Sequence, residues 1–173
     1  MGTIIRPDML KNALGAKLAA AAAQLLELRE AEQPRLTPHL SPHEIIGAFL
    51  LHVRGVYPIV DTFGRAQAGE LMYKAWHETW RNSLTKPDLA LWDRLRDDAK
   101  HHEHAHGAEL VEDEIAVKVD PTATRPGGGN ARKVRVRFAA DPNRAASEVC
   151  ADYLRLARRF VDAFVRANEQ ILR

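Results

Sequence analysis

Apolar residues recur at helical spacing over most of the chain. In the segment 8–32, leucine or alanine recurs every three or four residues, and many of the remaining positions are alanine, the best helix former. The segment is followed by EQPRLTPHLSP, in which three prolines interrupt the pattern. These features predict an N-terminal helix over residues 8–32.

A second helix is predicted to start at the sequence SPHE, residues 41–44. It places a serine at the N-cap, a proline at the first helical position and a glutamate three residues after the cap. The segment that follows, EIIGAFLLHVRGVYPIVDTFG, is apolar almost all round, so we expect it to be the central helix. Pro58 is expected to kink this helix and Gly64 to end it.

Two further helices are predicted between residues 65 and 107. The first covers 65–83, and its predicted inner face consists of Met72, Ala75, Trp76, Thr79 and Trp80. The second is capped by Thr85 and continues through DLALWDRLRDDAKHHEHAH to a stop at Gly107. A helical wheel places Trp92 and Leu95 on its core face and Arg94 toward solvent.

The pattern changes after Gly107. EIAVKV and KVRVRF alternate with period two and are separated by the Gly/Pro-rich segment DPTATRPGGGNA. They predict a β-hairpin insertion over 115–138, in which 115–119 pairs with 134–138. A last helix is expected over 145–172, with a core stripe of Val149, Tyr153, Leu156, Phe160, Phe164 and Ala167. The predicted fold is mainly α, a single domain (1–173) that forms an up-and-down bundle of about five helices with the hairpin before the last.

Composition limits the function classes. The 173 residues carry a formal net charge of +2, with 46% hydrophobic and 28% charged residues, as expected of a globular domain without an overall affinity for polyanions. The single cysteine excludes an intramolecular disulfide and a CxxC metal site. The longest alanine-rich apolar run is too short to span a bilayer. We expect a cytoplasmic protein with no membrane association. P-loop, GxGxxG and GxSxG motifs are absent.

The stretch RDDAKHHEHAHG, residues 96–107, is the strongest candidate for chemistry, because it holds four of the eight histidines within six residues. On the helical wheel, His102 and His106 share the core face, whereas His101 faces solvent. Three interpretations remain open. The cluster is a polar helix end; or it is an acid–base centre in which Arg96 stabilises phosphate charge while a histidine moves a proton; or it binds a metal.

The metal interpretation rests on the spacing of His102 and His106. Histidines four residues apart on a helix can bind zinc or another first-row divalent ion, as in a DinB-like bundle, provided that a third ligand is near. The candidate third ligands are His52, Asp61, His77, Glu78 and Glu103.

The sequence LRDDAKHHEHAHG, late on a helix of a small helical bundle, resembles the R-x4-6-H motif of the HEPN superfamily. Arg96 followed by Asp97 fits its start, and His101 or His102 fits its end. The preceding stretch WHETWRNSLTKPDLALWDR and the apolar helix before it also resemble HEPN-like bacterial proteins. The resemblance covers residues 41–107. The stronger form of the motif, Arg-Asn followed by His, is absent, and the hairpin is an insertion.

The resemblance implies a metal-independent endoribonuclease without a cofactor, acting as a homodimer in a toxin or antiviral setting, with an antitoxin or other partner protein. Many HEPN-like proteins lack nuclease activity, so an RNA-binding or non-catalytic partner-binding module is also consistent with it. In this chain Arg96 would polarise the scissile phosphate, His102 or His101 would act as general base or acid, and Asp97 would orient them. The helical wheel favours His102 as the catalytic histidine, because it lies on the core face. An active site at a dimer interface would favour His101, which lies on the outer face.

Basic residues outside the motif provide candidate RNA contacts. The alternation of the second strand places Lys133, Arg135 and Arg137 on one face, which is suited either to phosphate contact or to a charged, solvated edge. Lys100 lies within the motif. Arg54 lies in the apolar central helix, where an unpaired charge is costly, and so predicts either a buried pair with Asp61 or a phosphate contact.

Overall fold

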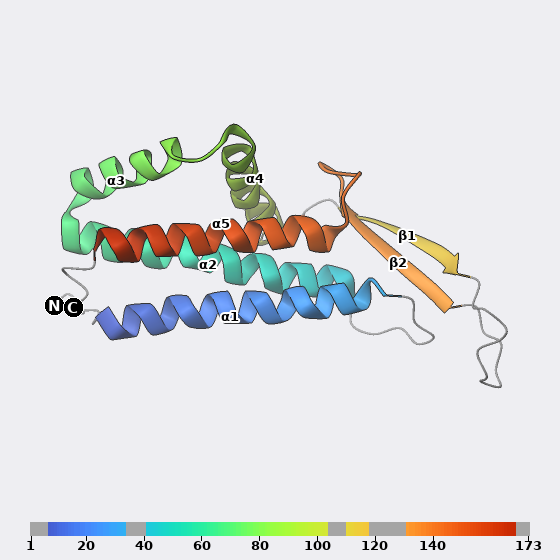
Figure 1. Ribbon diagram of the computed structural model, residues 1–173. Helices are drawn as coiled ribbons and strands as arrows, with labels where there is room; N and C mark the ends of the chain where they lie inside the picture. The colour runs from blue at the N-terminus through green and yellow to red at the C-terminus, as the bar shows by residue number, and fades with distance from the viewer. Residues whose placement is uncertain (1–6, 34–40, 104–109, 118–130, 169–173) are drawn as a thin grey trace.

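The computed structural model describes residues 7–33, 41–103, 110–117 and 131–168, and between 96 and 134 it describes the backbone alone. Figure 1 shows α1, α2 and α5 side by side, with α4 inclined steeply to them. The elements in chain order are α1 (Pro7–Ala31), α2 (Pro42–Ala68), α3 (Glu70–Asn82), α4 (Lys86–Glu103), β1 (Leu110–Val117), β2 (Ala131–Phe138) and α5 (Ala146–Ala167). The predicted mainly helical bundle is confirmed.

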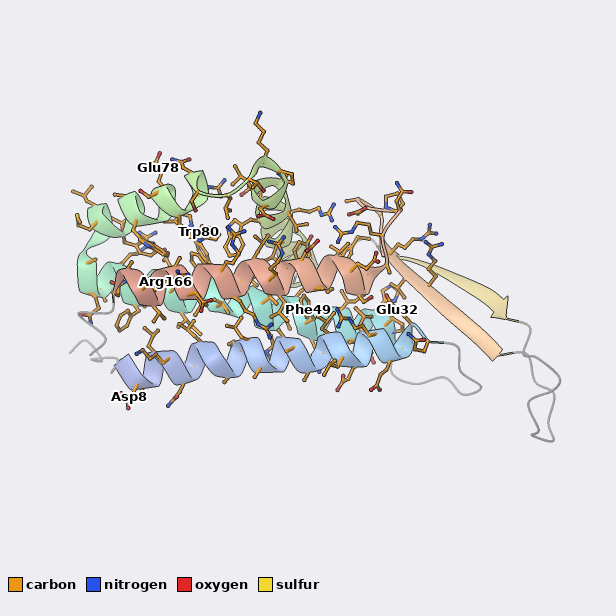
Figure 2. The ribbon with its side chains drawn as sticks, in the orientation of Figure 1. Asp8, Glu32, Phe49, Glu78, Trp80 and Arg166 are labelled. Atoms are coloured by element: carbon orange, nitrogen blue, oxygen red, sulfur yellow. The ribbon has the colours of Figure 1, made fainter. Side chains whose placement is uncertain are left out.

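The helix α2 is the centre of the bundle. It contacts α1, α3, α4 and α5, and Phe49, Leu50 and Val60 are fully buried in the core. Figure 2 shows Phe49 between the ribbons of α1 and α5. In the described ranges α2 is the one helix long and apolar enough to cross a membrane. Its position inside the bundle accounts for that composition.

The helix α1 buries the stripe that the sequence predicts. Leu10, Leu14, Ala21 and Leu28 are at most 1% exposed. Its C-terminal end is tied to the start of α5, because the Glu32 carboxylate accepts hydrogen bonds from the backbone N–H and the hydroxyl of Ser147. A carboxylate at a helix N-terminus satisfies backbone donors that have no partner within the helix.

The predicted end of the central helix at Gly64 is wrong. The helix continues through Pro58 and Gly64 to Ala68, and Gly69 caps it with a φ of +80°, which suits glycine. Gly64 is buried inside α2 because the Tyr73 ring packs directly on its backbone, where a Cβ would collide with that ring. The glycine therefore allows α3 to fold back closely on α2. The helix begins at Pro42 as predicted, but the Ser41 side chain makes no capping hydrogen bond.

The predicted inner face of the third helix is confirmed at Trp76 and Trp80 and wrong at Met72, Ala75 and Thr79, which are exposed. Met72 is 67% exposed, whereas Tyr73 and Trp80 are buried and Trp76 packs against the core. The aromatic residues, more than the aliphatic ones, therefore define the side of α3 that faces the bundle.

The hairpin is confirmed, but its predicted register is wrong. β1 and β2 are antiparallel, and Phe138 pairs with Leu110, where the prediction placed Ile115; Ile115 pairs with Lys133. The predicted partner segment 118–119 lies outside the described residues. Val136 and Phe138 are buried and Arg135 is exposed, as alternation requires.

The last helix confirms its predicted stripe up to Phe164. Val149, Tyr153, Leu156, Phe160 and Phe164 are all at most 1% exposed. Ala167 is exposed, and its place in the core is taken by Asn168, whose side-chain amide donates to the Phe164 carbonyl at 2.8 Å. The described helix ends at Ala167, so the predicted extension to residue 172 lies outside the described residues.

Candidate functional site

The candidate motif lies on the second half of α4. The helix begins after Thr85, whose hydroxyl oxygen accepts the Asp88 backbone N–H at 3.3 Å, as the predicted cap requires. Its backbone is helical through Glu103, so Arg96, Asp97, Lys100, His101 and His102 all occupy helical positions. Their side chains are not among those described, and His106 and Gly107 lie wholly outside the described residues.

The first half of α4 is anchored to α5 by charged side chains. The Asp88 carboxylate accepts from Arg155 at 2.7 Å and from Arg159 at 2.8 Å. Arg155, and to a lesser extent Arg159, holds the pKa of Asp88 below its usual value. Arg155, Arg158 and Arg159 are all exposed on α5, and two of them, Arg155 and Arg159, also pair with Asp88.

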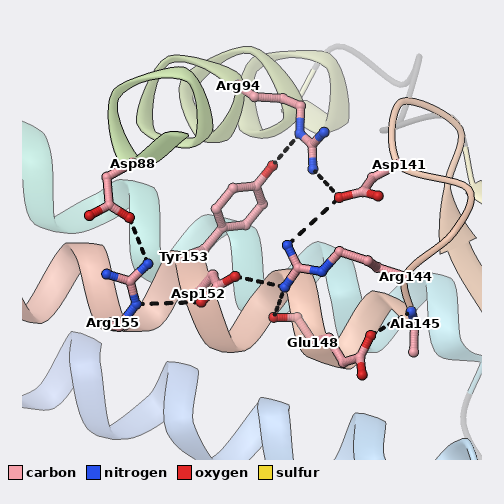
Figure 3. A network of polar contacts seen from close by, with 9 residues as sticks. All are labelled: Asp88, Arg94, Asp141, Arg144, Ala145, Glu148, Asp152, Tyr153 and Arg155. Atoms are coloured by element: carbon pink, nitrogen blue, oxygen red, sulfur yellow. Dashed lines mark hydrogen bonds and ion pairs between the residues drawn. The ribbon is translucent and has the colours of Figure 1, made fainter. Parts of the chain in front are cut away.

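A second anchor corrects the prediction for Arg94. This residue was expected in solvent, but its Nε donates to the Tyr153 hydroxyl at 3.1 Å and its Nη1 to the Ala140 carbonyl at 3.3 Å. Figure 3 shows Arg94 reaching from α4 toward Tyr153 on α5 and Asp141 after β2. One side chain thus links α4, α5 and the end of the hairpin, immediately before the motif.

Helix geometry sets the separation between the motif's arginine and its histidines. With 100° and 1.5 Å per residue, His101 lies about 140° around the helix from Arg96 and about 7.5 Å along it. His102 lies about 120° away on the other side. Lys100 is one turn after Arg96. A single straight copy of α4 therefore places the arginine and either histidine on different faces.

The positions of the two histidines can be compared with described side chains one heptad earlier. His102 is seven residues after Leu95, which is 4% exposed, and so lies on the same side of α4 as this core residue. His101 is seven residues after Arg94 and so lies on the same side of α4 as that arginine. The two candidate histidines therefore occupy different sides of the helix.

The other predicted RNA contacts lie in different environments. Arg135 is exposed on β2, while Arg137 donates to the Pro142 carbonyl at 3.0 Å. Lys133 is on β2, and its side chain is not described. Arg54 lines a cavity in the bundle, and its expected partner Asp61 instead accepts from Arg65 at 2.9 Å.

The metal interpretation stays a prediction, because the side chain of His102 is not among those described. Within the described part of the chain no three His, Cys, Asp or Glu residues are close enough to hold an ion. His52, His77, Glu78 and Asp61 thus do not form such a group with one another. His106, one half of the predicted pair, lies outside the described residues.

A cavity of about 370 Å³, which the sequence analysis did not predict, opens between α2, α3 and α4. Its polar lining comes from Arg54 on α2, His77 and Arg81 on α3, and Asp93 on α4. Arg81 and Asp93 form a paired hydrogen bond, with Nη1 at 2.7 Å and Nη2 at 3.0 Å from the two carboxylate oxygens. This geometry fixes both groups in the wall. Arg81 and Asp93 are 12 residues apart on either side of the short turn at 83–85, and this turn was the available signal for the pair.

His77 lies against the aromatic core beside this cavity. Its ring is within about 6 Å of the rings of Tyr57, Tyr73, Trp80 and Phe160, measured between centroids. Burial, and then the positive charge of Arg81, lowers the pKa of His77. Its Nε2 is buried and has no hydrogen-bond partner among the described residues. Burial therefore favours the neutral form of the imidazole.

The chain was compared with protein-family models, with curated proteins and with solved structures, and none of them matches it.

Proposed function

We propose that the protein is a HEPN-like, RNA-directed helical bundle, and that the second half of α4 is a metal-independent endoribonuclease centre. The observation that carries the proposal is the continuous helix of α4 through Arg96 and His102, which follows directly on a half anchored by Asp88 and Arg94. Anchoring supports the proposal because catalytic groups need a rigid base.

The proposed reaction is attack of a ribose 2′-hydroxyl on the adjacent phosphate. Arg96 binds the phosphate and stabilises the charge that develops on its oxygens. A histidine takes the proton from the 2′-hydroxyl, and a second histidine donates a proton to the departing 5′-oxygen. The products are a 2′,3′-cyclic phosphate and a free 5′-hydroxyl, so neither water nor metal is consumed. Asp97 would orient the arginine and histidine.

The spacing on α4 favours an active site shared by two copies of the chain. Arg96 and His101 lie on different faces of one helix, so one copy cannot easily direct both at a single phosphate. Two α4 helices related by a twofold axis would bring Arg96 of each copy toward the histidines of the other. A homodimer in the cytoplasm, controlled by an antitoxin or another partner that covers this surface, is the form we propose.

The RNA strand would extend from α4 toward the hairpin. Arg94 ties the α4 helix to the segment after β2, so the motif and the exposed Arg135 belong to connected elements. Lys100 and Lys133 would add phosphate contacts along this path. Arg137 is engaged by a backbone carbonyl and contributes less.

The test is cleavage of a labelled single-stranded RNA in EDTA. The wild-type protein should cleave, and the product should carry a 2′,3′-cyclic phosphate by mass spectrometry. Arg96→Ala should lower the rate by roughly 100-fold or more, the size expected when a phosphate-binding or proton-transfer group is lost. Arg158→Ala, which removes an exposed arginine of α5, is the matched control. Undiminished cleavage by Arg96→Ala, or cleavage that requires a divalent metal, would contradict the proposal.

A further inference from the structure

We propose that the cavity between α2, α3 and α4 is a binding site for a guanine base. The assignment of this base to a guanosine of the RNA strand rests on the proposed function. The cavity volume of about 370 Å³ is within the range of small-molecule sites. Three features support a base: the unused donors of Arg81, the aromatic rings in the wall, and the position of the cavity beside Arg96.

Arg81 is fixed in the cavity wall and keeps hydrogen-bond donors for a ligand. Its Nη1 and Nη2 atoms donate to the two carboxylate oxygens of Asp93 at 2.7 and 3.0 Å. A guanidinium has five N–H groups, so three remain after these two bonds. Within the described residues no further hydrogen bond or ion pair involves Arg81. Its side chain is 31% exposed, so a ligand can reach it.

The unused donors suit an uncharged edge that has two adjacent acceptors. The Asp93 carboxylate offsets the charge of Arg81, so these donors do not require an anion. Guanine presents two neighbouring acceptors, O6 and N7, and their contact with a paired arginine is the commonest specific contact between a protein and a base. Adenine has a donor at N6, which would meet an N–H group of Arg81, and pyrimidines lack N7.

Aromatic side chains from all three helices line the same cavity. They are Tyr57 on α2, His77 on α3 and Trp92 on α4. Tyr57 is 37% exposed and Trp92 is 8% exposed, so the aromatic surface extends from solvent into the bundle. Proteins bind the unstacked bases of single-stranded RNA by stacking them on such rings and by hydrogen bonds to their edges. The described wall offers both kinds of contact.

The cavity lies beside the motif on α4. Trp92, Asp93 and Leu95 line it, and the helix continues through Arg96 without a break. At 100° per residue, position 96 lies about 40° around the helix from Trp92 and about 60° from Asp93, between the two and about one turn further along. Arg96 therefore occupies the side of α4 that faces the cavity. A base held in the cavity would bring its adjoining phosphate toward this turn.

Calorimetric titration of the full chain with guanosine 5′-monophosphate in EDTA tests the base site. The monophosphates of adenosine, cytidine and uridine carry the same ribose and phosphate and are the comparisons. The guanine nucleotide should bind one-to-one, and the other three at least about fivefold more weakly, as expected of one paired arginine contact. The 7-deaza analogue, which lacks N7, should also bind more weakly. Inosine 5′-monophosphate, which keeps O6 and N7, should bind as well as the guanine nucleotide.

Two pairs of variants locate the binding. Arg81→Lys keeps a positive charge beside Asp93 but loses the planar fork, so it should abolish the preference for guanine. Arg158→Lys, at an exposed arginine of α5, should retain that preference. Leu51→Trp should obstruct the cavity and abolish binding, whereas Leu26→Trp, at a similarly exposed leucine of α1, should not. The leucine pair keeps the test valid if Arg81→Lys fails to fold.

Oligonucleotides separate a guanosine of RNA from a free guanine nucleotide. A 2′-O-methyl uridine oligomer with one internal guanosine cannot react through a 2′-hydroxyl, so fluorescence anisotropy reports its binding alone. It should bind several-fold more tightly than the all-uridine oligomer. Equal affinities would overturn the assignment to RNA.

The guanine site is overturned if the four nucleotides bind equally or not at all, or if Leu51→Trp leaves binding unchanged. These measurements do not depend on cleavage. Selective guanine binding without RNA cleavage would contradict the proposed function alone, and cleavage without guanine binding would contradict the guanine site alone.

Discussion

The two sides of α2 differ in how they are filled. Toward α1 and α5 the buried side chains are almost entirely apolar, as Leu14, Phe49 and Phe160 illustrate. Toward α3 and α4 the wall includes Arg54, Arg81 and Asp93, and a cavity remains. Apolar faces close on one another because each contact removes surface from water. Charged groups must keep partners or solvent, so the side where they meet stays partly open. The closed side supplies most of the apolar core, and the open side contains the cavity.

The largest expected loss of stability is at Phe160, because its ring contacts aromatic residues of both α3 and α4. Its ring lies 4.8 Å from that of Trp80 and 5.2 Å from that of Trp92, between centroids. Phe160→Ala should lower the free energy of unfolding by about 3–5 kcal/mol, measured by guanidinium denaturation. Leu71→Ala, at a leucine that is 83% exposed, should change it by less than about 0.5 kcal/mol. A comparable small loss at Phe160 would show that the core is not continuous across α2.

Alanine substitutions at Gly64 and Gly15 compare a closely packed position with an open helix surface, through their effects on the free energy of unfolding. Gly64→Ala should destabilise the fold by about 1–3 kcal/mol, because a Cβ there collides with the Tyr73 ring. Gly15→Ala, at a helical glycine of α1 with no heavy atom within 4 Å of the added Cβ, should stabilise it by about 0.4–1 kcal/mol. Equal effects at the two positions would contradict the packing of α3 on α2. Urea denaturation of both variants is the measurement.

The ion pairs that anchor α4 to α5 should contribute less to the free energy of unfolding than the core contacts do. Asp88→Asn removes the ion pairs with Arg155 and Arg159 and should cost about 1 kcal/mol at neutral pH. Because these arginines lower the pKa of Asp88 in the folded state, its stabilising effect is complete above the usual pKa of 3.8 and is lost as the pH falls further. The stability difference between wild type and variant should therefore shrink below that pH. A difference that does not change with pH would show that the carboxylate charge is not the cause.

The smallest expected effect on stability is the pH dependence that His77 causes. Its folded-state pKa is lowered, mainly by burial, so the unfolded chain takes up a proton near pH 6.5 and the folded chain does not. Wild-type stability should therefore decrease as the pH falls below 6.5, toward the lower pKa of the folded state. His77→Phe should remove this part of the pH dependence. Identical profiles for wild type and His77→Phe, from thermal unfolding at several pH values, would contradict the burial of a neutral imidazole.

The sequence predicted the elements whose signals are local. The Thr85 cap, the α1 stripe and the alternation at Val136 and Phe138 are each readable within a few residues, because they depend on backbone geometry and periodicity. The boundary between α2 and α3 was missed, because Gly64 looks like a helix end in sequence but serves a tertiary contact with Tyr73.

The polar sites were harder to predict, because their members are distant in sequence. Arg94 reaches Tyr153 across 59 residues, and Arg54 and Asp93 line one cavity only because α2 and α4 pack together. A helical wheel assigns Arg94 to solvent because it contains no neighbouring helix. The motif positions on α4 were predicted as helical, which the backbone confirms. Their catalytic role remains a prediction.

The most direct test of the proposed shared active site is complementation between two inactive variants. Arg96→Ala and the double variant His101→Ala/His102→Ala are purified separately, mixed under conditions that exchange subunits, and assayed on labelled RNA in EDTA. Each should be inactive alone. The mixture should recover about a quarter of wild-type activity, because half of the dimers are mixed and each mixed dimer holds one intact site of two. A mixture as inactive as its components, when the wild type cleaves, would contradict a site shared between two copies of α4.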